Sequence, residues 1–283
     1  MTPILRSRLQ RIRTYGALRE FFHPDRRERI DAQKALRLIA VERAAYGEFL
    51  TNEDRLEMLV CLIKGIPAER RQAVLRQAGY SRGQLMQDLF VLSELGELRG
   101  RGFFVEFGAT DGVALSNSWL LEKRLSWKGI LAEPGRCWHE ALCHNRGCAI
   151  ETKCVWSCSG EYLSFDEVSS AELSTLSDFA QTDKHGQARS DFKRYQVPTI
   201  SLNELMRRHD APPEPDYLSI DTEGSEFAIL SEFDFDRYPF KVITCEHNHS
   251  PIRDEIRGLL ESKGYRRKHE NLSQIDDWFV RAS

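Results

Sequence analysis

The chain has 283 residues, of which 41% are hydrophobic and 29% are charged, and its formal net charge is −3. That length can bury one large core together with a smaller helical segment. No apolar run is long enough to span a membrane, and no basic stretch is interleaved with aromatic residues, so we expect neither stable membrane insertion nor nucleic-acid binding.

The first hundred residues read as a small helical bundle. Apolar residues recur at helical spacing over 55–63, 68–77 and 82–95, separated by Gly-containing breaks. Residues 1–20 carry five arginines with no acid before Glu20, which resembles a transit peptide or an interfacial helix. We favour a solvated helical face, because the arginine-rich stretch extends beyond residue 20, where acidic residues are interspersed with the arginines. We predict a helical N-terminal region over residues 1–99, a possible surface for homo-oligomers, and a second domain over 100–283.

The most informative segment is the run 103–112, in which an apolar strand ends in Glu106 and turns through Gly108 and Gly112. Such a turn lets backbone N–H groups approach a ligand, and the helix expected at 116–125 would bring its positive end. The run lacks the full glycine pattern of a dinucleotide site and the lysine of a phosphate loop. We therefore expect a nucleotide-like ligand without a pyrophosphate.

A second strand at 129–133 ends in Glu133, 27 positions after Glu106, which is the spacing of a strand, a helix and a strand. Carboxyl ends of parallel neighbours face a common ligand crevice, so Glu133 is placed to accept both hydroxyls of an unphosphorylated ribose. The alternative is a solvated strand terminus. A helix around 138–145 and a strand over 149–156 continue the alternation, which is typical of a doubly wound α/β domain.

The segment 160–197 departs from this alternation. We expect a hairpin strand at 162–165, followed by a polar stretch over 181–191 that would form a lid or substrate loop. The sheet resumes at 217–221 and 241–246. After a helix at 252–263, we expect an antiparallel edge pair at 265–269 and 277–281.

Two further strands end in polar residues. The first leads into Asp221 and Glu223, and the second into Glu246, His247 and Asn248. Strand ends that meet at one edge of a sheet are where chemistry would sit. Each residue also has a plain structural reading, since Asp221 can cap the following helix and a lone histidine is more often a hydrogen-bonded strand-end residue.

The seven cysteines are an odd count without any C-x-x-C pair. A disulfide framework is therefore disfavoured, and the cluster between Cys137 and Cys158 matches no structural zinc spacing. We expect buried, reduced thiols, which suit a cytoplasmic compartment.

Four motifs in order resemble the FkbM family of S-adenosylmethionine-dependent methyltransferases. They are the segments 106–112, 133–134, 199–205 and 221–226. The resemblance spans residues 100–281, and Thr110 stands where the family usually has Asn. It implies an α/β fold, namely a Rossmann-like, doubly wound, seven-stranded methyltransferase sheet preceded by the small helical region.

The resemblance also implies roles for the candidate residues. The residues expected to bind S-adenosylmethionine are Glu106, Gly108, Asp111, Gly112, Asn117, Glu133, Val155 and Trp156. Among these, Asn117 would contact the methionine end, and Val155 and Trp156 would flank the adenine or belong to the core.

Transfer of a methyl group to an alcohol requires help with the leaving proton. A general base is one route, with His247, His249 and Glu223 as its candidates. Asp221 is also counted among the catalytic residues, together with Glu223 and His247. The other route is a divalent cation such as Mg²⁺ held by Asp221, Glu246 and Asn248. We therefore predict an O-methyltransferase that acts on a hydroxyl of a small molecule, either a sugar, a glycan or a secondary metabolite. The alternative is a non-catalytic interaction or scaffold protein that keeps the fold.

Overall fold

The computed structural model describes residues 52–64, 66–168, 175–176, 192–222 and 224–282. The chain divides between Leu98 and Arg99 into two compact units. The Arg-rich segment 1–20, the predicted substrate loop at 181–191 and Glu223 lie outside the described residues.

The first unit contains α3 (Asn52–Ile63), α4 (Ala68–Gln77), a short 3₁₀ turn (Ala78–Tyr80) and α5 (Gln87–Leu95). The last helix begins five residues later than the apolar spacing predicts, because the preceding loop is held by Asp88. The buried carboxylate of Asp88 accepts hydrogen bonds from Ser81 Oγ at 2.6 Å and from the backbone N–H of Arg82 at 2.9 Å. These bonds fix residues 81–83 in a non-helical conformation.

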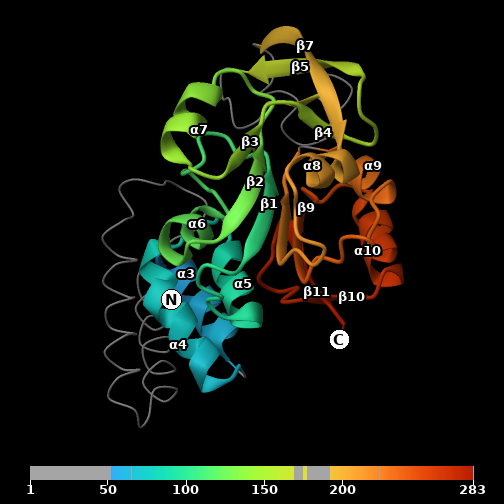
Figure 1. Ribbon diagram of the computed structural model, residues 1–283. Coiled ribbons are helices and arrows are strands. Elements are labelled where there is room, and N and C mark those ends of the chain that lie inside the picture. The colour runs from blue at the N-terminus through green and yellow to red at the C-terminus, as the bar shows by residue number, and fades with distance from the viewer. Residues whose placement is uncertain (1–51, 65, 169–174, 177–191, 223, 283) are drawn as a thin grey trace, which may run out of the picture. The chain divides into compact units, whose positions relative to one another are not determined.

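The second unit is built on a seven-stranded sheet in the order β10-β11-β9-β8-β1-β2-β3 (Figure 1). The strands are β1 (Phe103–Phe107), β2 (Lys128–Ala132), β3 (Ala149–Glu151), β8 (Tyr217–Ile220), β9 (Val242–Glu246), β10 (Tyr265–Lys268) and β11 (Asp276–Arg281). β3, β2, β1, β8 and β9 are parallel, whereas β11 runs antiparallel to both β9 and β10. The predicted doubly wound sheet and its antiparallel edge pair are confirmed.

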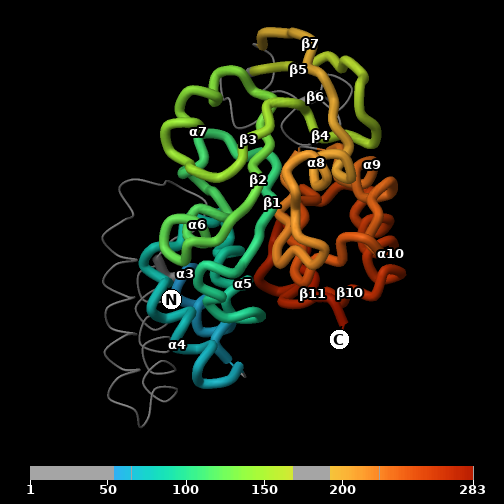
Figure 2. The backbone as a smooth tube through the Cα atoms, viewed as in Figure 1, coloured from blue at the N-terminus to red at the C-terminus, as the bar shows by residue number. Residues whose placement is uncertain are grey.

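The central strands are apolar because both faces of the sheet are covered. One face packs on α8 (Leu202–Arg208), α9 (Glu226–Ser231) and α10 (Arg253–Ser262), and Leu205, Leu230 and Leu260 belong to that buried core. α6 (Trp119–Leu125) and α7 (His139–Asn145) lie on the opposite side of the sheet from α9 and α10 (Figure 2). The strand order reverses at β1, so β8 and β2 flank β1 on its two sides.

A second, four-stranded sheet has the order β4-β7-β5-β6. Its strands are β4 (Cys154–Trp156), β5 (Tyr162–Val168), β6 (Thr175–Leu176) and β7 (Phe192–Ser201). The expected hairpin strand at 162–165 is confirmed as part of β5. The single strand expected over 149–156 is wrong: the chain turns at Thr152 and Lys153, so β3 joins the large sheet and β4 pairs with β7.

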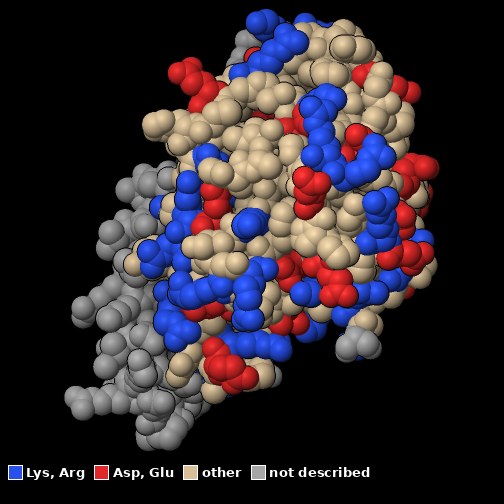
Figure 3. Space-filling model, viewed as in Figure 1, with Lys and Arg blue, Asp and Glu red and all other residues tan. Residues whose placement is uncertain are grey.

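No helix in the described part of the chain is long and apolar enough to cross a membrane. On the face drawn in Figure 3, the described Lys and Arg side chains are intermixed with Asp and Glu. All seven cysteines are free, but only Cys154 and Cys245 are buried. The expectation of buried thiols is wrong for Cys137, Cys143 and Cys158, which are exposed; Cys143 lies on α7, whose buried residue is Leu142.

Candidate active site

The carboxyl ends of β1 and β8 meet at Gly108. This glycine is exposed and has φ +70°, and a Cβ added there would lie 2.1 Å from the backbone carbonyl oxygen of Asp221. Only glycine allows that approach. Because β1 and β8 flank the point at which the strand order reverses, this is the edge of the sheet where doubly wound folds bind ligands.

Glu106 is the second-last residue of β1 and is buried beneath the loop that follows. Its Oε1 accepts a hydrogen bond from the backbone N–H of Asn117 at 2.7 Å. Its Oε2 accepts bonds from Ser116 Oγ at 3.0 Å and from Ser118 Oγ. The carboxylate therefore holds the loop 108–118 in place, and the ligand contact expected of Glu106 stays a prediction.

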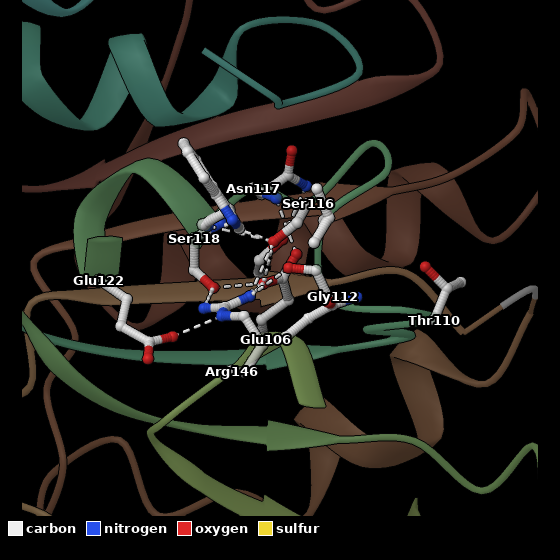
Figure 4. Close-up of polar contacts among 12 residues, drawn as sticks. Glu106, Thr110, Gly112, Ser116, Asn117, Ser118, Glu122 and Arg146 are labelled. Carbon is white, nitrogen blue, oxygen red and sulfur yellow. Dashed lines mark hydrogen bonds and ion pairs between the residues drawn. The ribbon is translucent and has the colours of Figure 1, made fainter. Parts of the chain in front are cut away.

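Arg146 lies at the centre of this loop and is absent from the sequence-based predictions (Figure 4). It caps the C-terminus of α7, and its guanidinium is completely buried. Nη1 donates to Gly112 O at 2.9 Å and to Ser116 Oγ at 3.1 Å, Nη2 donates to Ser118 Oγ at 2.9 Å, and Nε donates to Glu122. No motif signals these contacts, because Arg146 is 30 residues from Ser116 and follows a different strand.

Asp111 and Gly112 shape the middle of the loop. Asp111 Oδ1 accepts bonds from the backbone N–H groups of Val113 and Ala114, each at 2.8 Å, which closes a local turn. Gly112 has φ +76°, and a Cβ there would lie 2.6 Å from Cγ of Arg146. Both residues therefore set the loop's backbone conformation.

Asn117 carries an unsatisfied polar atom at the end of the same loop. Its Nδ2 donates to Ser219 Oγ on β8 at 2.9 Å. Its Oδ1 is buried and has no hydrogen-bond partner among the described residues. A buried acceptor without a donor costs free energy, and a ligand amino group would relieve that cost.

Glu133 follows β2 and is also buried. Its Oε2 accepts a bond from the backbone N–H of Thr110 at 2.8 Å, and its Oε1 accepts one from Gly135 at 2.7 Å. Burial raises the pKa of this carboxyl to about 7, the two N–H donors oppose the rise, and the charges of Asp221 and Glu167 add to it. Glu133 thus lies close to Asp221 and is half-ionised near neutral pH.

The loop after β8 brings Asp221 against Glu246 from β9. Burial raises the pKa of Asp221, and a side-chain hydrogen bond with Glu246 opposes the rise. Two carboxyl groups can share a hydrogen bond only when one of them carries a proton. Asp221 is not the N-cap residue of α9, which is Ser225. In the turn before that helix, Glu226 Oε1 accepts the backbone N–H groups of Thr222 at 3.1 Å and Gly224 at 3.0 Å.

His247 is directed toward β11. Its Nδ1 accepts a bond from the backbone N–H of His249 at 2.9 Å, and its Nε2 lies 3.8 Å from Asp277 Oδ1. Burial lowers the pKa of His247 to about 4; the charge of Asp277 opposes this, whereas that of Arg253 adds to it. The imidazole is neutral at physiological pH and is a weak proton acceptor there.

The remaining predicted site residues lie near these loops or within the second sheet. Val155 is buried in the main apolar core, and Trp156 is partly buried against the small cluster of Cys154, Phe165 and Val197. Asn248 follows β9 with φ 45°. Over the described ranges, no group of three or more His, Cys, Asp and Glu side chains is arranged to hold a metal ion, so the cation route through Asp221, Glu246 and Asn248 gains no support.

Comparison with known proteins identifies the family. The model of the methyltransferase FkbM domain matches residues 106–267, which is more than half of the chain. The chain belongs to the FkbM methyltransferase family. The match begins at Glu106 and contains every candidate site residue named above.

A solved structure of the methyltransferase FkbM from Methylobacillus flagellatus KT is similar to this protein with 11% sequence identity and a TM-score of 0.45. The similarity covers 80% of this chain and 58% of that one, so this FkbM-family chain spans little more than half the length of its structural neighbour. No curated protein matches the chain.

Proposed function

We propose that this FkbM-family protein is an S-adenosylmethionine-dependent O-methyltransferase that acts on a hydroxyl of a sugar, glycan or secondary metabolite. The observation that carries the proposal is the close approach of Gly108 to Asp221 at the strand-order reversal, with the buried carboxylate of Glu133 beside it. A glycine turn and a carboxylate at the ends of adjacent strands suit an adenosyl ligand with free ribose hydroxyls.

The residues present are suited to that cofactor. Glu133 would accept the ribose hydroxyls, and the buried Oδ1 of Asn117 would accept the ammonium of the methionine moiety. Gly108, Asp111 and Gly112 would form the backbone cradle, with Glu106 supporting it from below. Val155 and Trp156 remain candidates for the adenine side.

When bound, S-adenosylmethionine supplies an electrophilic methyl group. The chain's own task is then to orient the acceptor hydroxyl and take up its proton. We assign proton uptake to Asp221, because its pKa is raised and it shares a hydrogen bond with Glu246. Burial shifts the two candidates in opposite directions: it raises the pKa of Asp221, which favours proton uptake, and lowers that of His247 to about 4, which disfavours it. Glu223 remains a candidate from the sequence.

Isothermal titration calorimetry with S-adenosylhomocysteine tests the proposal. We expect micromolar binding by the natural protein and its loss in Gly108→Ala, because the new Cβ would displace the Asp221 carbonyl. Gly264→Ala is the matched control, since Gly264 also has a positive φ of +85° but no atom within 4 Å of an added Cβ. Circular dichroism would verify that both variants fold.

Absence of binding in the natural protein would refute the enzyme and favour the scaffold alternative. If binding is found, transfer of a labelled methyl group to a panel of hydroxyl and amine acceptors would identify the substrate class. Preference for amines would contradict the O-methyl assignment. We also propose a cytoplasmic location, to which seven unpaired cysteines are suited, and homo-oligomers through the N-terminal region remain a proposal.

A further inference from the structure

The buried cluster around Arg146 links three separate parts of the second unit. The guanidinium contacts Glu122 on α6, Gly112 and the serines of the loop 108–118, and its own residue ends α7. Its Nη1 also lies 3.9 Å from Glu106 Oε2. The guanidinium thus connects both helices on this side of the sheet to the loop that follows β1 (Figure 4).

Stability alone does not explain such a cluster. Burying an arginine between two glutamates costs a large desolvation energy, and apolar residues of similar volume are often at least as stabilising. Unlike apolar side chains of similar volume, a guanidinium presents several N–H donors in a rigid plane. Here those donors hold a backbone carbonyl and two hydroxyls of one loop.

The contacts of Arg146 also fix the position of the loop atoms that are proposed to bind the cofactor. Ser116 and Ser118, held by Arg146, also donate to Glu106, which in turn accepts the backbone N–H of Asn117. Asn117 lies between these serines, and its free Oδ1 is buried. The stem of Arg146 packs on Gly112, where a side chain would collide with it.

We infer that Arg146 is a positioning residue that holds the loop 108–118 in its cofactor-binding conformation before the cofactor arrives. A loop already ordered in the free protein loses less conformational entropy on binding, and so binds more tightly. The inference rests on the proposed function, because it requires that this loop receives S-adenosylmethionine.

Arg146→Lys tests the inference, since it keeps the charge but loses most of the planar donor set. We expect S-adenosylhomocysteine to bind about tenfold more weakly or worse. Hydrogen exchange of residues 108–118 should become faster in the ligand-free variant, while exchange of β8 and β9 stays unchanged. The matched control is Arg253→Lys, because Arg253 also donates two bonds to a buried aspartate, Asp277, at 2.8 and 2.9 Å. The control should lose thermal stability without losing affinity.

Equal affinity and equal loop exchange in Arg146→Lys and the natural protein would overturn the inference while leaving the proposed function intact. No binding by the natural protein would overturn both. If Arg146→Lys does not fold, Glu122→Gln weakens the same cluster from α6 and should also accelerate exchange at 108–118. Unchanged exchange in that variant would likewise overturn the inference.

Discussion

The pKa of Glu133 predicts that cofactor affinity depends on pH in the neutral range. Burial raises this pKa to about 7, although the backbone N–H groups of Thr110 and Gly135 favour the ionised form. Ribose hydroxyls donate hydrogen bonds, so the ionised carboxylate is the form that binds. Protonation of Glu133 must therefore compete with the cofactor.

The magnitude follows from the fraction ionised. At pH 6, one unit below the pKa of about 7, roughly one tenth of Glu133 is ionised, so the apparent affinity should be about tenfold weaker than at pH 8.5.

The same ionisation should change the stability of the ligand-free protein with pH. The folded state binds this proton more tightly than the unfolded chain, so the ionised carboxylate costs roughly 3 kcal/mol above pH 7. That cost disappears as the pH falls from 7 toward 4.5.

The assay is calorimetric titration of S-adenosylhomocysteine at half-unit steps from pH 6 to pH 8.5. Glu133→Gln is the control, because an amide does not ionise in this range. Its NH₂ group also cannot replace the second carboxylate oxygen, which accepts one of the two backbone N–H groups. This variant should bind more weakly and show no pH dependence between these limits. An affinity that is constant with pH in the natural protein would refute the reasoning, as would the same pH profile in both proteins.

Three other substitutions test neighbouring groups. Asp221→Asn should lower kcat by about 100-fold or more with little change in S-adenosylhomocysteine affinity, and an unchanged kcat would exclude Asp221 as the base. Thr110→Asn should raise the free energy of unfolding in urea by about 1 kcal/mol, because a β-branched residue is strained at φ 47° and asparagine is not; a loss of stability would contradict this. Glu226→Ala should cost about 2 kcal/mol in the same assay, because it leaves the N–H groups of Thr222 and Gly224 without their buried acceptor, and a neutral result would argue that water replaces it.

Local patterns in the sequence determined the strands and the residues that end them. The run 103–107 is mostly apolar because β1 is covered on both faces. Its length, the acid near its end and the following glycines could all be predicted from neighbouring residues. The same reasoning placed Glu133 and Asp221 at the ends of the two parallel strands that flank β1. It also placed the antiparallel strands at the C-terminal end of the chain.

Only the tertiary structure decided which groups meet across long sequence separations. Arg146 reaches the loop after β1 from the end of α7, and the turn after β3 sends β4 into another sheet; neither has a local signal. The direction of His247 toward Asp277 depends likewise on the pairing of β9 with β11. Periodicity reports which faces of an element are buried, but hydrogen bonds and pKa values depend on partners that the fold brings together from distant parts of the chain.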